Sequence, residues 1–337
     1  MKNPTFTYSI VIRTLGTGGE KYQKLLNSIK TQTIQPKHTY VIIAEGYSLP
    51  QQRLGNEEFI YTRKGMWHQR IFGLEYVAKH LDSDFIFAVD DDISFLPDLV
   101  ANSIRWMENN HCDVLAPDLD SICLSSGILK SIFSFKNLIY SLLGLRVENP
   151  FQKERVKIMG TSGFMANTNV CSDAVPTQSA QFAAFFIRTD KVKLLDLKSE
   201  YWLEGTKYAL PDDQVFYYKC YLFGLKIYMH EKYTINHLDH GSSNPDRISD
   251  ISYANGRNFF IFWHRFLFSR AGLIKKLWLI VCIMYRIIML FIFYLIKSVL
   301  QMNFKLLNSY CSGVFAGIAY VLSPEYKRLP IVYKLKP

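Results

Sequence analysis

The 337-residue sequence has little of what marks secreted or zinc-binding proteins. It contains only six cysteines, none of them in a C-x-x-C pair, so neither a disulfide framework nor a structural zinc site is indicated. Scattered single thiols are typical of a reducing compartment. The first residues, MKNPTFTYSIVIRT, lack the apolar region of a signal peptide. We therefore expect the folded body to stay in the cytoplasm.

Acidic residues are in the minority, and internal repeats and low-complexity linkers are absent. There are 39 Lys and Arg against 29 Asp and Glu, which gives a formal net charge of +10. Such an excess suits an anionic partner: nucleic acid, anionic lipid or a phosphorylated substrate. A hydrophobic content of 49% argues against disorder. The basic residues accompany the apolar C-terminal part rather than an aromatic groove, so no nucleic-acid partner is expected.

The first half of the sequence alternates short apolar runs with amphipathic patterns. These patterns predict strands at residues 8–13, 39–44 and 84–89, and helices over 20–32 and 66–81. Strands separated by helices of this length form a mostly parallel sheet covered on both faces. In such a sheet the ligand binds beyond the carboxyl ends of the strands. The predicted fold class is therefore α/β.

Three consecutive carboxylates, Asp90, Asp91 and Asp92, follow the third predicted strand directly. Like charges in a row repel one another, so their adjacency costs folding energy. Residues i and i+2 of an extended segment project to the same side, which would place Asp90 and Asp92 together at the mouth of the sheet. Carboxylate oxygens suit Mg²⁺ or Mn²⁺, and a bound cation would offset the repulsion. The alternative is a solvated acidic loop.

Taken in order, several segments resemble the nucleotide-binding half of the family 2 glycosyltransferases, which have the GT-A fold. The segments are SIVIRT, SIKTQT, VIIAEGY and KGMWHQRIFGLEYVAKHLDSDFIFAVDDD. The resemblance covers about residues 8–265 and implies a Rossmann-like sheet. In this family the strand-ending D-x-D binds the metal and the diphosphate. The resemblance therefore implies that Asp90 and Asp92 bind Mg²⁺ or Mn²⁺, and that Asp90 and Asp91 lie at the diphosphate.

An acidic pair that opens a helix is a further feature of the family, with a Gly 11 residues and a His 24 residues later. A helix is predicted over 211–224, and counting from Asp213 gives Gly224 and His237. The resemblance implies that Asp213 is the base that removes the proton of the acceptor hydroxyl. Asp212 is the alternative, because the pair is Asp-Asp where the family more often has Glu-Asp. Without the resemblance, the two acids would simply stabilise the helix N-terminus.

The resemblance implies roles for a few more positions. His237 matches the metal-binding His of the family, and His240 is the alternative ligand. Thr14, after the first strand, and Glu45, after the second, match positions that contact the nucleoside. Arg70 lies 20 residues before Asp90 and matches an Arg that faces the diphosphate.

From about residue 257 the sequence becomes aromatic, basic and strongly apolar. Residues 277–296 are 20 residues with one charge, Arg286. At about 1.5 Å per residue such a helix is long enough to cross a bilayer. Lys275, Arg286 and Lys297 are each 11 residues apart, which places them nearly in line on a helix. A line of cations favours a helix that lies in the interface of an anionic leaflet over a spanning one. A core helix of a soluble protein is the remaining alternative.

These features predict two regions. A GT-A domain is expected at residues 1–256, with its nucleotide-sugar half at about 1–115 and its acceptor half at about 116–256. A basic, hydrophobic, membrane-associating region is expected at 257–337, where the small residues within 310–326 suit close helix packing. The expected location is the cytoplasmic face of the inner membrane, with peripheral or monotopic attachment.

The function that follows is that of an inverting, metal-dependent glycosyltransferase. It would move a sugar from a nucleoside-diphosphate sugar to a hydroxyl of a lipid-linked or cell-surface glycan at an anionic membrane surface. One alternative is a sugar-phosphate nucleotidyltransferase, for which LGTGGEK at 15–21 is a poor candidate phosphate loop. The other is a non-enzymatic, basic membrane-binding protein, in which the acidic triplet and the spaced pair would have no role.

Overall fold

The computed structural model describes residues 6–17, 19–80, 83–119, 147–148, 152–163, 165–168, 173–238 and 245–332. The chain forms two compact units, and each is assembled from three stretches of sequence. The first, here called the sheet unit, comprises Met1–Ser125, Cys171–Lys198 and Lys219–Gly241. The second, the helical unit, comprises Ser126–Val170, Ser199–Tyr218 and Ser242–Pro337. The predicted boundary between residues 256 and 257 stays a prediction.

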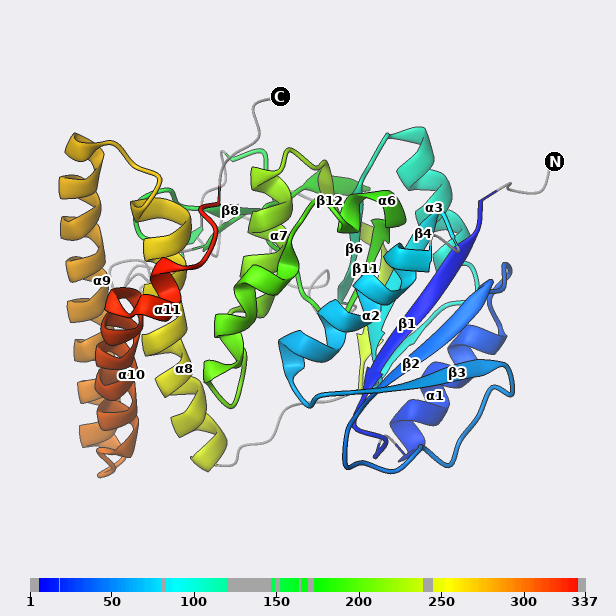
Figure 1. Cartoon of the computed structure of the whole chain (residues 1–337), viewed down its shortest axis with the longest axis horizontal. Coiled ribbons are helices and arrows are strands. Elements are labelled where there is room, and N and C mark those ends of the chain that lie inside the picture. Colours follow the sequence, from blue (N-terminus) through cyan, green and yellow to red (C-terminus); the bar gives the residue numbers. More distant parts are fainter. Residues whose placement is uncertain are drawn as a thin grey trace. The chain divides into compact units, whose positions relative to one another are not determined.

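The sheet unit is built on a mostly parallel β-sheet (Figure 1). Its strands are β1 (Tyr8–Thr14), β2 (His38–Ala44), β3 (Glu57–Thr62), β4 (Phe85–Asp90), β5 (Ile93–Phe95), β6 (Val114–Leu119), β10 (Ala174–Pro176), β11 (Ala184–Arg188) and β12 (Ile227–His237). Their order in space is β10-β12-β6-β11-β4-β1-β2-β3, with β5 paired to β12. Strands β3, β2, β1 and β4 are parallel, whereas β11 runs antiparallel to β4 and β6.

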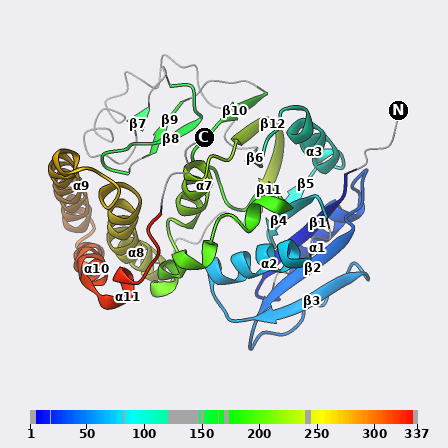
Figure 2. The same cartoon turned by 45° about the horizontal axis from the view of Figure 1, so that its top comes forward.

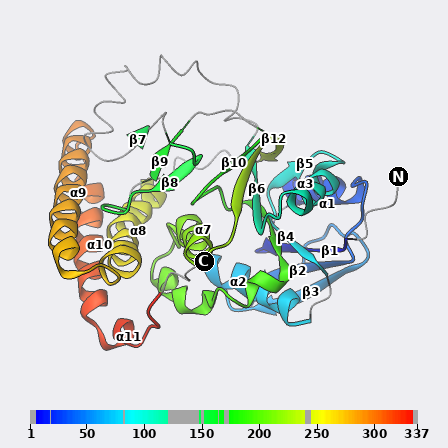
Figure 3. The ribbon, with the colours of Figure 1, turned by 90° about the horizontal axis from the view of Figure 1, so that it is seen from above.

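Helices cover both faces of this sheet (Figure 3). They are α1 (Gly19–Lys30), α2 (Met66–His80) and α3 (Leu99–Asn109), and a short helix, α6 (Thr189–Val192), follows β11. Helices α1 and α3 pack on one face, where the apolar residues Tyr22, Leu25, Leu26 and Ile29 of α1 are buried. Helix α2 packs on the other face, with Gly73 against Val11 and Ile42. The predicted α/β class, with the arrangement that the GT-A resemblance implies, is confirmed.

The parallel strands bring their carboxyl ends to one edge of the sheet. Thr14 ends β1, Ala44 ends β2 and Asp90 ends β4, and the register pairs Arg13 with Asp90 across β1 and β4. The strands themselves are mostly apolar and almost completely buried, as a sheet covered on both faces requires. The charged side chains Arg13 and Asp90 lie at or next to the strand ends, and this edge carries the candidate site.

The helical unit contains a small sheet and a group of long helices (Figure 2). Its strands are β7 (Val147–Glu148), β8 (Val156–Ile158) and β9 (Met165–Asn167). Its helices are α8 (Pro245–Trp263), α9 (Leu273–Leu300), α10 (Lys305–Leu322) and α11 (Pro324–Lys327), with a π-helical turn at His264–Phe268. A 3-10 segment (Leu197–Gly205) and α7 (Asp212–Leu222) each have residues in both units.

Helices α8 and α10 approach closely because glycines line their contact. A Cβ atom on Gly256 would lie 2.5 Å from the carbonyl oxygen of Tyr310, and one on Gly317 would lie 2.8 Å from that of Arg257. A Cβ atom on Gly313 would collide with the carbonyl of Tyr253. The prediction that the small residues within 310–326 serve close helix packing is confirmed.

Helix α9 is long and apolar enough to cross a membrane by length and composition, and 28% of its most apolar stretch is buried. The predicted line of three interfacial cations is wrong for its central member. Arg286 is only 4% exposed, and its Nη1 donates to the carbonyl oxygen of Ser162 at 2.7 Å. Its guanidinium also lies 4.5 Å from the centre of the Phe259 ring. This side of α9 is covered at its middle by other parts of the helical unit, and so Arg286 faces protein.

Candidate active site

The acidic triplet, Asp90 to Asp92, lies at the carboxyl edge of the sheet, and each carboxylate has a different partner. Asp90 is held by two guanidinium groups. Arg13 donates from Nε to Oδ1 at 3.0 Å and from Nη2 to Oδ2 at 2.9 Å. Arg70 donates from Nη2 to Oδ1 at 2.6 Å. Two positive charges thus compensate the first acid of the triplet, and both come from the same edge of the sheet unit.

Arg70 itself is buried, with 4% of its surface exposed. Its Nη1 donates to the carbonyl of Phe182, and its guanidinium lies 3.9 Å from the centre of the Phe182 ring. The sequence resemblance placed this residue at the site but gave no role to Arg13. The signal for Arg13 is its position as the one charged residue of a mostly apolar strand, next to the strand end, because a charge there needs a partner.

Asp91 is paired with Thr14, which ends β1. The Thr14 hydroxyl donates to Asp91 Oδ2 at 2.5 Å, and its oxygen accepts from the backbone N–H of Gly16 at 2.9 Å. Burial raises the pKa of Asp91 to about 6, although the bond from Thr14 acts in the opposite direction. The neighbouring carboxylates of Asp90 and Asp92 add to the rise. Asp91 is therefore the member of the triplet that is hardest to keep ionised.

Asp92 faces His237, which ends β12. Asp92 Oδ2 lies 3.4 Å from His237 Nε2, and β5 pairs with β12 so that the backbone N–H of Leu238 donates to the Asp92 carbonyl at 2.7 Å. Burial would raise the pKa of Asp92, but the hydrogen bond and charge of His237 and the charges of Arg13 and Lys21 together outweigh it, and the pKa is lowered. The other oxygen, Oδ1, is buried without a hydrogen-bond partner. Asp92 is therefore the member of the triplet that has a buried oxygen without a hydrogen bond.

These residues fit a divalent cation in part. One imidazole nitrogen and one carboxylate with an unsatisfied oxygen are a donor set that Mg²⁺ or Mn²⁺ accepts, with the remaining positions open to water or phosphate. Within the described ranges, no group of three or more His, Cys, Asp or Glu side chains is arranged to hold a metal. The alternative ligand, His240, lies outside those ranges. The metal roles predicted for Asp90, Asp92 and His237 stay predictions.

Glu45 lies at the same edge, directly after β2. Its side chain is exposed, and its backbone N–H donates to the carbonyl of Thr62 at 2.8 Å. Gln69 of α2 ties the neighbouring strand ends together, because its Nε2 donates to the carbonyls of Thr14 at 3.0 Å and Ile42 at 3.2 Å. The sheet unit thus brings together Thr14, Arg70, the acidic triplet and His237, with Glu45 on the adjacent strand.

Asp212 and Asp213 open α7 and belong to the helical unit. Asp212 is 7% exposed, and Asp213 Oδ1 accepts from the backbone N–H of Gln214 at 2.6 Å. Acids in the first turn of a helix are stabilised by the helix dipole. Gly224 has a φ of +79° just beyond the end of α7, as its predicted place at the helix C-terminus requires.

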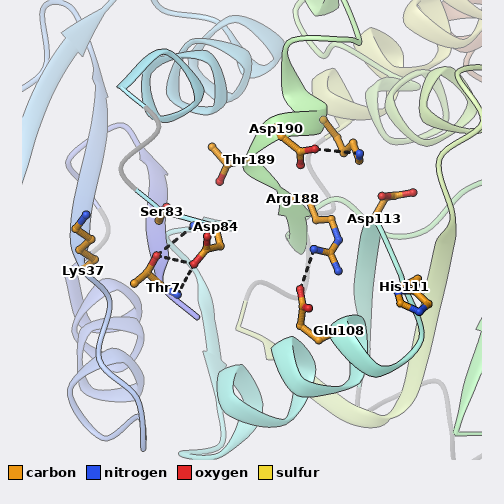
Figure 4. A pocket seen from close by; sticks show the side chains of 11 residues that line it. Thr7, Lys37, Ser83, Asp84, Glu108, His111, Asp113, Arg188, Thr189 and Asp190 are labelled. Atoms are coloured by element: carbon orange, nitrogen blue, oxygen red, sulfur yellow. Dashed lines mark hydrogen bonds and ion pairs between the residues drawn. The ribbon is translucent and has the colours of Figure 1, made fainter. Parts of the chain in front are cut away.

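The edge opposite the acidic triplet carries a polar cavity of about 700 Å³ (Figure 4). Its walls include Thr7 and Asp84, which precede β1 and β4, and the ion pair of Arg188 with Glu108 at 2.8 Å. Asp84 Oδ2 accepts from the backbone N–H of Thr7 at 2.8 Å and from its hydroxyl at 2.9 Å. Because these charged groups satisfy one another, and the strands present their amino ends here, this cavity is not the candidate site.

No protein-family model matches the sequence, and no curated protein is similar to it. Among solved structures, TarS from S. aureus is 14% identical with a TM-score of 0.46, over 83% of this chain and 43% of that one. GalNAc-T7 with UDP, GalNAc and Mn²⁺ is 12% identical with a TM-score of 0.49, over 88% of this chain and 58% of that one. A197 from STIV is 11% identical with a TM-score of 0.38. The chain spans about half the length of the first two. Identities and TM-scores this low carry no argument about function, so a function has to be argued from the residues of this chain.

Proposed function

We propose that this chain is an inverting glycosyltransferase, which moves a sugar from a nucleoside-diphosphate sugar to a hydroxyl group. The observation that carries the proposal is the buried, unpartnered Oδ1 of Asp92 beside His237. A buried polar atom without a hydrogen bond costs about 1–3 kcal/mol, more when charged, and a ligand that satisfies it removes the cost. Thr14 and Glu45, at the ends of β1 and β2, lie where the nucleoside of the donor would bind at this edge.

Asp92 and His237 are the residues that would hold Mg²⁺ or Mn²⁺. When bound, the ion would stabilise the negative charge that develops on the departing diphosphate. Arg13 and Arg70 bring two more positive charges to the same edge, and Asp90 fixes both. Asp90 as a metal ligand, and Asp91 at the diphosphate, are the remaining parts of this proposal.

Asp213 is proposed as the general base, with Asp212 as the alternative. The carboxylate takes the proton of the acceptor hydroxyl while the oxygen attacks the anomeric carbon of the donor. The new glycosidic bond forms on the face opposite the breaking carbon–oxygen bond, whose electron pair leaves with the nucleoside diphosphate. The backbone N–H of Gln214 donates to this carboxylate at 2.6 Å and so orients it.

The proposed acceptor is a lipid-linked or cell-surface glycan, reached from an anionic membrane surface. The outer face of α9 is apolar and exposed, and is formed by Ile274, Leu277, Trp278, Val281, Met284, Tyr285, Ile288, Phe291, Ile292, Ile296 and Val299. Lys275 and Lys297 lie near the two ends of α9, and Lys305 begins α10. An exposed apolar face with cations near its two ends matches the charge of an anionic leaflet. The proposed location is the cytoplasmic face of the inner membrane.

The opposite side of α9 favours attachment in the plane of the membrane over spanning. Its buried residues recur every three or four positions along the whole helix: Leu279, Ile283, Arg286, Leu290, Tyr294 and Ser298. Leu290 and Tyr294 belong to a core cluster shared with Leu306, Leu307 and Tyr310 of α10. A helix surrounded by lipid would have to give up this packing and expose the Arg286 guanidinium, which costs about 2.5–3.5 kcal/mol at the bilayer centre.

A panel of nucleotide sugars, tested with Mg²⁺ and with Mn²⁺, tests the reaction. We expect metal-dependent release of a nucleoside diphosphate from at least one donor, and loss of the metal dependence in Asp92→Ala. Release of pyrophosphate would instead identify a nucleotidyltransferase. A protein that turns over no donor, or an Asp92→Ala variant with unchanged activity and metal dependence, contradicts the proposal.

Flotation of the full chain with phosphatidylglycerol vesicles tests the membrane surface. We expect the double variant Trp278→Gln and Ile288→Gln, on the outer face of α9, to lose most of its vesicle binding. Leu96→Gln is the matched control, because Leu96 is an apolar side chain with 66% exposure outside α9. Equal flotation of all three proteins would rule out this face as the membrane contact.

A further inference from the structure

The described part of the loop between β8 and β9, residues 159–163 and here called the β8–β9 loop, is held by side chains from three different helices. Three consecutive carbonyl oxygens of this loop each accept one hydrogen bond from a buried or nearly buried side chain. The pairs are Trp263 Nε1 of α8 to Thr161 at 3.1 Å, Arg286 Nη1 of α9 to Ser162 at 2.7 Å, and Gln214 Nε2 of α7 to Gly163 at 2.8 Å. All of these residues belong to the helical unit. The loop is therefore a fixed link between α7, α8 and α9.

Local packing leaves this loop little freedom. The backbone N–H of Gly163 donates to the carbonyl of Met159 at 3.0 Å, which closes the turn. Gly163 has a φ of +73°, and a Cβ atom there would lie 3.3 Å from the Phe262 ring. Hydrogen bonds in such a water-poor setting are stronger than those at a surface. A shift of one donor would therefore move the whole turn rather than a single carbonyl.

The loop connects on its other side to the proposed base. Gln214 is fully buried, and its side chain reaches Gly163 while its backbone N–H donates to Asp213 Oδ1 at 2.6 Å. The orientation of the Asp213 carboxylate is thus tied to the position of the loop. The position of the loop is tied in turn to Arg286 on α9.

Arg286 would not be needed if α9 only had to pack. Burying a guanidinium group is expensive, and an apolar side chain of similar volume is often as stable or more stable at such a position. What the guanidinium adds is a directed bond of 2.7 Å to Ser162 and a fixed place over the Phe259 ring. That bond runs from the side of α9 opposite its proposed lipid contact.

The geometry points to Arg286 as a positioning residue that links the membrane-facing helix to the base. Docking of α9 on an anionic leaflet restrains Arg286 further, and through it the β8–β9 loop, Gln214 and Asp213, so that the base is held most firmly when the enzyme reaches its acceptor. This inference rests on the proposed function for the role of Asp213. The link itself is a physical property of the helical unit that can be measured without turnover.

Hydrogen exchange of the full chain, with and without phosphatidylglycerol vesicles, tests the link. In the wild-type protein we expect vesicles to slow exchange in α9, and also in residues 156–163 and 212–218, by about fivefold or more. In Arg286→Met, α9 should still be protected, whereas the loop and the first turn of α7 should not respond. Protection confined to α9 in the wild type, or no vesicle protection at all, overturns the inference.

Two further variants separate positioning from folding. Arg286→Lys keeps a donor for Ser162 and should restore part of the response of the loop. Gln214→Glu removes the donor to Gly163, so the loop should still respond to vesicles while residues 212–218 do not. Lys207→Met, which removes an exposed cation of the same unit, is the control and should behave like the wild type. If Arg286→Lys is no better than Arg286→Met and Gln214→Glu responds fully, the link is absent.

Donor hydrolysis supplies the catalytic readout, with water as the acceptor. Arg286→Met should lower kcat for nucleoside-diphosphate release about tenfold, with the KM for the donor unchanged, because only the base is displaced. A raised KM with an unchanged kcat would contradict a positioning role. If the wild type releases no nucleoside diphosphate from any donor, the proposed function fails, and the exchange experiment still decides whether the link exists.

Discussion

The two units of this chain place their charged groups in opposite ways. In the sheet unit, carboxylates gather at one edge, and one of their oxygens, Asp92 Oδ1, is left without a hydrogen bond. In the helical unit the buried charges are mainly arginines, and their bonds end on the chain itself: Arg286 on Ser162, and Arg265 on Glu200. An unsatisfied charge at a strand end points to a ligand, whereas a charge whose bonds end on the chain itself holds parts of the chain in position.

A general base at the start of α7 would be an exception to this contrast, because a residue of the helical unit would then take part in the reaction. We expect Asp213→Asn to lower kcat about 100- to 10,000-fold, because it removes the proton acceptor. Stability should stay close to that of the wild type, since Asn also suits a helix N-terminus. The measurement is nucleoside-diphosphate release from the best donor, with donor binding followed separately.

Asp212→Asn is the matched control for this change. It alters the neighbouring residue in the same turn, and a loss of less than about tenfold is expected if Asp213 is the base. A larger loss at Asp212 than at Asp213 would transfer the role to the first residue of the pair.

The buried pair of Arg265 and Glu200 gives the largest expected effect on stability. Arg265 donates from Nε and Nη2 to the two oxygens of Glu200 at 2.6 and 2.9 Å, and Glu200 also accepts from Trp202 Nε1 at 2.7 Å. Arg265→Met leaves the fully buried carboxylate of Glu200 without its cationic partner. The free energy of unfolding, measured by urea denaturation, should fall by about 3–5 kcal/mol.

An exposed pair of the same unit provides the comparison. Lys207 donates to Asp250 at 2.7 Å, but 66% of its side chain is exposed. Lys207→Met should therefore cost no more than about 1 kcal/mol. Similar losses for Arg265→Met and Lys207→Met would mean that burial does not set the strength of the first pair.

The parts of the fold that follow from local pattern were predictable, and the parts that depend on distant partners were not. Strands β1, β2 and β4 were predicted from short apolar runs, and α1 and α2 from periodicity, because each pattern is contained in one segment. The bond of Arg13 to Asp90 joins residues 77 positions apart, and nothing near Arg13 indicates its partner. For the candidate site, the acidic triplet and His237 were predicted. Of the two arginines that compensate Asp90, Arg70 was predicted and Arg13 was not.

Arg286 shows the same limit in the helical unit. Helical geometry predicted correctly that it lies in line with Lys275 and Lys297. It could not predict that this line is covered at its centre, because the covering carbonyl of Ser162 is 124 residues away in the sequence. Periodicity fixes the angle of a side chain around its helix, whereas burial is decided by what packs there.

The glycines of the two units also differ in their packing, with a smaller expected effect on the free energy of unfolding. In the helical unit, a Cβ atom on Gly313 would meet the backbone carbonyl of Tyr253, which cannot turn away. In the sheet unit, a Cβ atom on Gly73 would meet the side chains of Val11 and Ile42. Gly313→Ala should therefore lower the free energy of unfolding by about 1–3 kcal/mol, even though Ala favours the helix.

Gly73→Ala is expected to cost about 1 kcal/mol or less, because side chains adjust and the gain in helix propensity compensates. Urea denaturation of both variants measures the difference. A greater loss at Gly73 would show that the strand side chains of the sheet unit are as rigid as a backbone carbonyl.

The smallest expected effect concerns pH, and here the two units should behave alike. Burial lowers the pKa of His230, in the sheet unit, and of His264, in the helical unit, to about 4. In the unfolded chain both would titrate near 6.5. Below that pH the unfolded chain binds protons that the folded chain does not, so stability is lost as the pH falls from 6.5 towards 4. Between pH 7 and pH 6 the loss should be about 0.7 kcal/mol for each histidine.

Asparagine at either position separates the two contributions. His230 Nδ1 accepts from the backbone N–H groups of Lys232 at 3.2 Å and Tyr233 at 3.3 Å, and His264 Nδ1 lies 2.7 Å from the Tyr326 hydroxyl. The Oδ1 atom of Asn can replace Nδ1 in these contacts but does not titrate. His230→Asn and His264→Asn should each remove about half of the pH dependence from these two groups, measured as the change in urea midpoint between pH 7 and pH 6. Because His230 is only 1% exposed, whereas His264 is partly exposed, an effect confined to His264 would show that burial does not govern these shifts.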